Sequence, residues 1–171
     1  MRYIISSICI FFLFSCIEDE LPSQNRGLII NEFLASNNSC CSDDYGDFDD
    51  WVEFYNDSDI AMDIGGMYFS DTPNDQSPYL IPLSDPVSTT IQPGGYLLIW
   101  CDDDQEQGAL HVSKKLNKAG ESIILLDKDG LSVIASHTYE SQSTDISMGR
   151  NPNNYDEWIY FDNPTPGYFN N

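Results

Sequence analysis

The chain has 171 residues, which is enough for roughly one domain of ~100–200 residues. Its 41% hydrophobic and 13% aromatic residues can bury a core, so disorder is excluded for most of the chain. The 28 Asp and Glu residues against 7 Lys and Arg give a formal charge of −21, which disfavours direct binding to the phosphate backbone of a nucleic acid.

The first segment is typical of an export signal. Arg2 precedes an almost uncharged run over residues 3–14, which is shorter than the ~20 apolar residues of a membrane-spanning helix. The run ends in Leu13-Phe14-Ser15-Cys16, which resembles a bacterial lipobox. We therefore expect residues 1–15 to be a lipoprotein signal peptide and Cys16 to carry the lipid. The alternative is an ordinary secretory peptide, whose cleavage site prefers small residues that Leu13 and Phe14 do not supply.

Residues 16–27 are expected to be a lipidated tether, because they lack apolar periodicity and include Pro22 and Gly27. The acidic residues Glu18-Asp19-Glu20 behind Cys16 resemble the surface-export signal of Bacteroidetes lipoproteins. The resemblance implies an exported protein that is anchored in the outer membrane and faces the cell surface.

The body that follows is predicted to be all-β. From residue 28 onward the apolar residues come in short clusters separated by Gly, Pro, Asn and Asp, and no window has helical spacing long enough for a helix. Asp129-Gly130 indicates a tight hairpin. Strands at this spacing predict a two-sheet sandwich or a barrel. The expected strands are 28–35, 51–56, 66–70, 79–82, 96–101, 121–126, 131–136 and 157–161.

Seven segments of the body occur in a distinctive order. They are 28–37, 49–56, 64–71, 91–100 with its Pro-Gly-Gly-Tyr turn, 116–121, 147–150 and 164–170. In order and spacing they resemble the lamin tail domain family over residues 28–170. The resemblance implies an immunoglobulin-like β-sandwich.

The resemblance also implies a non-catalytic module for structural, tethering or adhesive interaction in the bacterial envelope. Its partner would be an unknown protein or glycan at the cell surface. One alternative is an accessory lipoprotein that captures carbohydrate on exposed Tyr and Trp rings. Another is an exported hydrolase, although His111 and His137 lack Cys or His at metal-ligand spacing and a Cys101–His111 dyad has no local signature.

Two acidic loops are the densest polar feature. Asp43, Asp47 and Asp49 lie in the first, and Asp102 and Asp104 follow the strand that ends at residue 101. Oxygen ligands in flexible loops suit Ca²⁺, although the spacing does not match an EF-hand. We expect either a calcium site built from these five residues or a solvated acidic surface.

Three cysteines remain after removal of the signal peptide and lipidation of Cys16. An exported domain lies where disulfides persist. Because a bond between the neighbours Cys40 and Cys41 needs a strained ring, we expect one of them to pair with Cys101.

Overall fold

The computed structural model describes residues 26–171, so the predicted signal peptide, Cys16 and nearly all of the tether lie outside the described residues. In the described part the elements are β1 (Leu28–Leu34), β2 (Trp51–Asn56), β3 (Met62–Asp63), β4 (Tyr68–Ser70), β5 (Tyr79–Leu80), α1 (Pro86–Thr89), β6 (Thr90–Ile91), β7 (Tyr96–Cys101), the 3₁₀ turn η1 (Gln105–Gln107), β8 (His111–Val112), β9 (Gly120–Leu126), β10 (Val133–Glu140), β11 (Ser147–Asn151) and β12 (Asn154–Phe161). No helix among these residues is long and apolar enough to cross a membrane.

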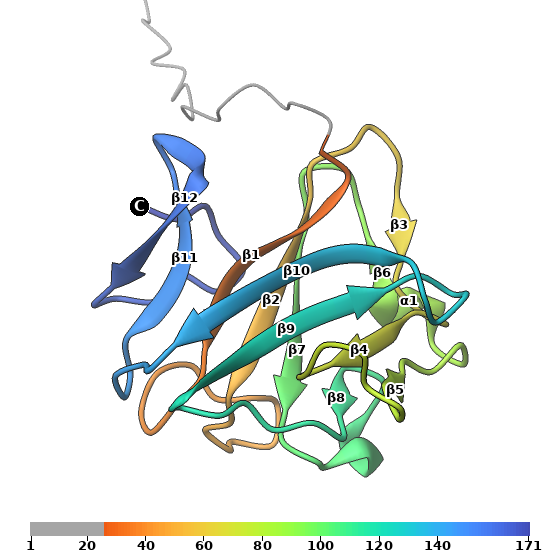
Figure 1. Cartoon of the computed structure of the whole chain (residues 1–171), viewed down its shortest axis with the longest axis horizontal. Helices are drawn as coiled ribbons and strands as arrows, with labels where there is room; N and C mark the ends of the chain where they lie inside the picture. Colours follow the sequence, from red (N-terminus) through yellow and green to blue (C-terminus); the bar gives the residue numbers. More distant parts are fainter. Residues whose placement is uncertain (1–25) are drawn as a thin grey trace, which may run out of the picture.

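Two principal sheets pack face to face. One has six strands in the order β12-β11-β1-β2-β7-β8, and the other has four in the order β10-β9-β4-β5. Neighbouring strands are antiparallel except for the short parallel pair β7–β8. In Figure 1 the strands β9 and β10 cross in front of β1, β2 and β7. The prediction of an all-β sandwich is therefore confirmed.

Alternation along each strand places the core between the two sheets. In β2, Val52 and Phe54 belong to the apolar core, and Glu53 between them faces the opposite side of the sheet. The opposing sheet contributes Ile123 and Leu125 at the same spacing. Phe33 in β1 contacts Tyr139 of β10 with a distance of 4.6 Å between ring centroids, which joins the two layers.

A β-bulge in β1 changes this alternation. The pairing of β1 with β2 shifts between Ile30 and Glu32. A bulge places two successive residues against one residue of the partner strand. Asn31 and Glu32 both hydrogen-bond to residues at the C-terminal end of the chain, whereas Ile30 and Phe33 lie in the core.

Several strand boundaries differ from the prediction. The expected bounds of β2 and β7 are confirmed, but β10 begins at Val133 and extends to Glu140. The hairpin between β9 and β10 is also confirmed, with a connection over 127–132 that is longer than a two-residue turn. The prediction included the two-residue strand β5 within 79–82, but it missed the equally short β3, β6 and β8 and the polar strand β11.

Candidate functional site at the acidic end of the sandwich

The loop that connects β1 to β2 forms one side of the candidate site. Buried Asn37 organises this loop: its Nδ2 donates to the carbonyl oxygens of Cys41 at 3.1 Å and Asp49 at 2.9 Å. The N–H of Cys40 donates to Asn37 Oδ1 at 3.1 Å. At the end of the loop, the N–H of Cys101 donates to the carbonyl of Asp50 at 2.8 Å, which ties the loop to the end of β7. Sequence reasoning did not identify Asn37, because its partners belong to the loop that it closes.

Three of the five predicted calcium ligands come together in this loop. Asp43, Asp47 and Asp49 each offer a carboxylate oxygen, and the three oxygens lie within 4.8 Å of one another. Partial burial raises the pKa of Asp49, and the charges of Asp102, Asp43, Asp47 and Asp104 raise it further. The structure therefore places both predicted acidic loops close enough to interact electrostatically.

Asp102 has a different role from the one predicted. Its Oδ2 lies 2.5 Å from Nδ1 of His111, and its Oδ1 accepts the N–H of Asp104 at 3.0 Å. Both Asp102 and His111 are buried. Two of its acceptor positions are thus taken up by holding His111 and the following loop, so Asp102 is not in the three-residue cluster. Sequence reasoning missed this pair, because the only available signal was the nine-residue separation of two common residue types.

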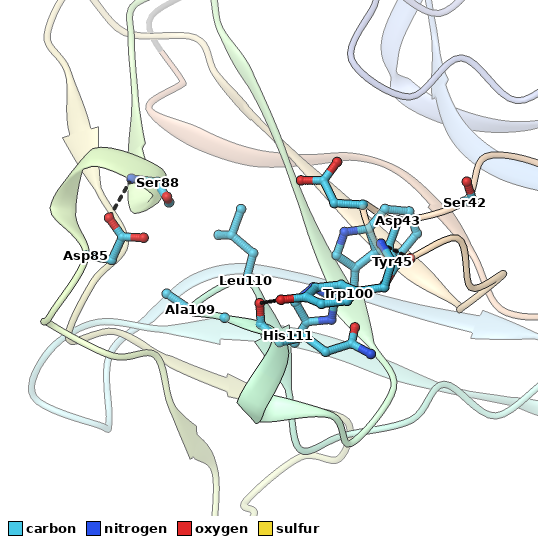
Figure 2. Close-up of a pocket in the computed structure, with 12 residues that line it drawn as sticks. Ser42, Asp43, Tyr45, Asp85, Ser88, Trp100, Ala109, Leu110 and His111 are labelled. Carbon is cyan, nitrogen blue, oxygen red and sulfur yellow. Dashed lines mark hydrogen bonds between the residues drawn. The ribbon is translucent and has the colours of Figure 1, made fainter.

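A hollow of about 330 Å³ lies beside the cluster. Tyr45, Trp100 and His111 line one side of it, and Asp85 and Ser88 at the start of α1 line the other (Figure 2). The rings of Trp100 and His111 are close to parallel, at 23° with centroids 6.4 Å apart. Tyr45 meets His111 edge-on at 6.1 Å, and its hydroxyl donates to the carbonyl of Gln107 at 3.2 Å. The hollow thus offers aromatic surface together with carboxylates.

The predicted disulfide to Cys101 is wrong. The structure joins Cys40 to Cys41 and leaves Cys101 as a free, buried thiol. Cys101 belongs to the core between the sheets, whereas Cys40 and Cys41 border a surface hollow with Pro164. Burial, followed by nearby carboxylates, raises the pKa of the Cys101 thiol well above its ordinary value. A protonated, buried thiol is a poor nucleophile, so the burial of Cys101 does not support a Cys101–His111 dyad.

Glu32 and Glu53 form a second polar cluster on the outer face of the six-stranded sheet. They are paired across β1 and β2, and neither is accessible to solvent. The N–H and Oγ1 of Thr165 donate to Glu32, at 3.1 and 2.8 Å. Asn31 Nδ2 at 2.7 Å and the N–H of Gly167 donate to Glu53. The C-terminal segment thus binds both carboxylates, which gives the pair a structural role in holding that segment.

Burial perturbs both carboxyl groups. It raises the pKa of Glu32 and raises that of Glu53 to about 8, with the charge of Glu32 adding to the effect on Glu53.

Gly149 of β11 lies against the same cluster. A Cβ atom there would stand 2.7 Å from Asn170 Nδ2 and 3.0 Å from the carbonyl of Asn31, so any other residue would force Asn170 to shift.

Comparison with known proteins agrees with this architecture. A protein-family model described as the Lamin Tail Domain matches residues 22–141, whereas no curated protein and no solved structure matches the chain. The matched residues include β1 to β10, and β11 and β12 then complete the six-stranded sheet beyond them. Lamin tail domains are immunoglobulin-like β-sandwiches, and the fold described above is of that kind. The chain therefore belongs to the lamin tail domain family.

Proposed function

We propose that this chain is a lipid-anchored, non-catalytic lamin tail module that presents the hollow beside Tyr45 to a protein on the bacterial cell surface. The Cys16 lipobox and the acidic residues behind it support anchoring in the outer membrane. Two acyl signals or more give stable anchoring where a single chain does not, and a lipidated N-terminal cysteine would carry a diacylglycerol and an N-acyl chain.

The observation that carries the proposal is the position of the hollow relative to the tether. Arg26 and Gly27, where the predicted tether meets the domain, lie beside Asp57 just past the end of β2: the N–H of Asp57 donates to the carbonyl of Gly27 at 2.8 Å. The loop that carries Tyr45 follows the other end of β1. In Figure 1, β1 begins at the top, and β7 and β8 end near the bottom.

The length of β1 gives the separation of these two ends. Its seven residues span about 23 Å at ~3.3 Å per residue. A domain attached through Arg26 would thus carry Tyr45 and the hollow about one strand length from its point of attachment. Such a placement suits contact with molecules outside the cell.

Glycan capture is less well supported by the rings in the hollow. Sugar-binding platforms would need exposed rings in one plane, yet Trp100 is close to parallel with His111 while Tyr45 is perpendicular to the same ring. Trp51 is fully buried, and Trp158 stacks on His137 at 3.7 Å. These contacts leave Tyr45 as the exposed ring of the hollow.

The test uses intact cells that express the full chain. Protein cross-linking followed by purification is performed on wild type, on Tyr45→Ala and on the matched control Tyr160→Ala, since Tyr160 is an exposed tyrosine on β12. We expect a defined cross-linked partner to be lost in Tyr45→Ala and kept in the control. Equal recovery in both variants would contradict the assignment of the hollow, and a glycan-only adduct would favour carbohydrate capture instead.

A further inference from the structure

We propose that Asp43, Asp47 and Asp49 bind one Ca²⁺ at the acidic end of the sandwich, with Oδ2 of Asp43 as the buried ligand. This inference rests on the loop geometry and does not depend on the lipid anchor or on the surface partner.

The first observation is a buried carboxylate oxygen without a partner. Asp43 is only 7% exposed. Its Oδ1 accepts the N–H groups of Tyr45 at 2.9 Å and Asp47 at 2.8 Å, whereas its Oδ2 is buried and has no hydrogen-bond donor among the described residues. Buried polar atoms are nearly always satisfied, because an unpaired one costs free energy. A bound cation would supply the missing partner.

The second observation is the spacing of the three carboxylates. Two oxygen ligands that each lie ~2.3–2.6 Å from one Ca²⁺ are at most about 5 Å apart. The oxygens of Asp43, Asp47 and Asp49 lie within 4.8 Å of one another, which is inside this limit for ligands of a single Ca²⁺. Water and backbone carbonyls would complete the ~6–8 oxygens that Ca²⁺ takes.

The chemistry of the donors selects the kind of ion. All three are carboxylates, and the cluster contains no imidazole or thiolate, the ligands that favour zinc or copper. Asp47 and Asp49 lie in a loop and not on a strand, and Ca²⁺ tolerates such adaptable geometry better than Mg²⁺, which requires a near-ideal octahedron. The donor set therefore favours Ca²⁺.

The surrounding charge supports a cation at this position. Asp102 and Asp104 both act on Asp49, so at least five carboxylates share this end of the molecule. Their mutual repulsion would fall when a divalent ion binds. Asp43 and Asp47 also flank Tyr45, so the ion would fix the segment that carries the exposed ring of the hollow.

Isothermal titration calorimetry of the full mature chain in detergent, with CaCl₂ as the probe at fixed ionic strength, tests the proposal. The titration should give one Ca²⁺ per chain. In a separate thermal unfolding measurement, a Ca²⁺ concentration of about 100 times the dissociation constant should raise the melting temperature by about 5–10 °C relative to excess chelator. MgCl₂ at the same ionic strength should produce a much smaller shift, because Mg²⁺ requires a near-ideal octahedron. Screening alone would shift the melting temperature equally for both ions.

Three variants locate the site. Asp49→Asn and Asp43→Asn should each weaken Ca²⁺ binding by at least about tenfold, which corresponds to one lost charged ligand. Asp44→Asn is the matched control, since Asp44 is an exposed neighbour outside the cluster, and its affinity should stay within about twofold of wild type. If Asp43→Asn fails to fold, Asp49→Asn decides, because no hydrogen bond to the Asp49 side chain holds the loop in the described structure.

Three results would overturn the proposal. The first is the absence of Ca²⁺ binding at millimolar concentration. The second is an equal shift with Ca²⁺ and Mg²⁺, and the third is an equal loss of affinity in Asp44→Asn and Asp49→Asn; either of these would indicate screening of an acidic surface. Because the measurement uses the purified chain, it can fail while the cell-surface proposal stands, and the reverse also holds.

Discussion

Replacing Glu53 by glutamine should change how the stability of the domain depends on pH. Glu53 lies on β2, where the C-terminal segment covers its side chain and makes it inaccessible to solvent. This burial raises its pKa from 4.5 to about 8. A carboxyl group with a raised pKa in the folded state binds its proton more tightly there than in the unfolded state. Its stabilising contribution is thus fully present below pH 4.5 and is lost as the pH rises through about 8.

The size of the effect follows from the two pKa values. Each unit of difference corresponds to ~1.4 kcal/mol, so between about pH 5 and about pH 9 the wild-type chain should lose about 4 kcal/mol relative to a chain without this titration. In Glu53→Gln the side chain stays neutral at every pH. The amide NH₂ of glutamine takes the place of one carboxylate oxygen, so the hydrogen bond from either Asn31 or Gly167 loses its acceptor. This loss costs ~1–3 kcal/mol at all pH values.

The assay is urea unfolding followed by tryptophan fluorescence across this pH range, for wild type, Glu53→Gln and the exposed control Glu157→Gln. Taking the difference between chains cancels the titrating groups that do not interact with Glu53, such as His137, whose pKa is lowered to about 4 mainly by burial. We expect the stability advantage of wild type over Glu53→Gln to shrink by about 4 kcal/mol from acid to alkaline pH. A constant difference, or an advantage that grows with pH, would refute the assignment of a protonated Glu53.

Three further predictions concern the anchor, the cysteines and the core. Mass spectrometry of the mature chain should find a lipidated N-terminal Cys16, and Cys16→Ala should block processing; a soluble mature form with an unmodified cysteine would contradict the anchor. Alkylation of the unfolded, unreduced mature chain should label Cys101 and leave Cys40 and Cys41 unlabelled. A label on Cys40 or Cys41 in place of Cys101 would indicate a disulfide to Cys101 instead. Phe54→Ala should destabilise the domain by about 3–5 kcal/mol in urea unfolding, because Phe54 is fully buried in the core, and a loss below about 1 kcal/mol would contradict its packing.

The strands that the sequence predicted best are those with a clear two-residue period. Val52 and Phe54 alternate with outward residues in β2, and Ile99 of β7 faces the same core, so the bounds of both strands could be read from local patterns. The two-residue strands β3, β6 and β8 and the helix α1 could not, because their formation depends on partners elsewhere in the chain. The Asp85 side chain that caps α1 is visible in the sequence, but four residues are too few to distinguish a helix from a turn.

The candidate site was partly predictable in the same way. The sequence identified the acidic loops by composition, and Asp43, Asp47 and Asp49 lie within one local segment that folds on itself. It gave no sign that Asp102 would bind His111, since that contact requires β7 and β8 to lie side by side.

The sequence by itself determined the fold class, the sandwich core and the acidic character of one loop, because these depend on residue type and on spacing along a strand. Tertiary structure decided which face each special residue occupies. Cys101 points into the core while Cys40 and Cys41 lie on a surface loop, so the expected bond does not form. Glu32 and Glu53 are buried only because a segment more than one hundred residues later in the chain crosses over them. Such contacts join residues that are distant in the chain, and no local pattern records them.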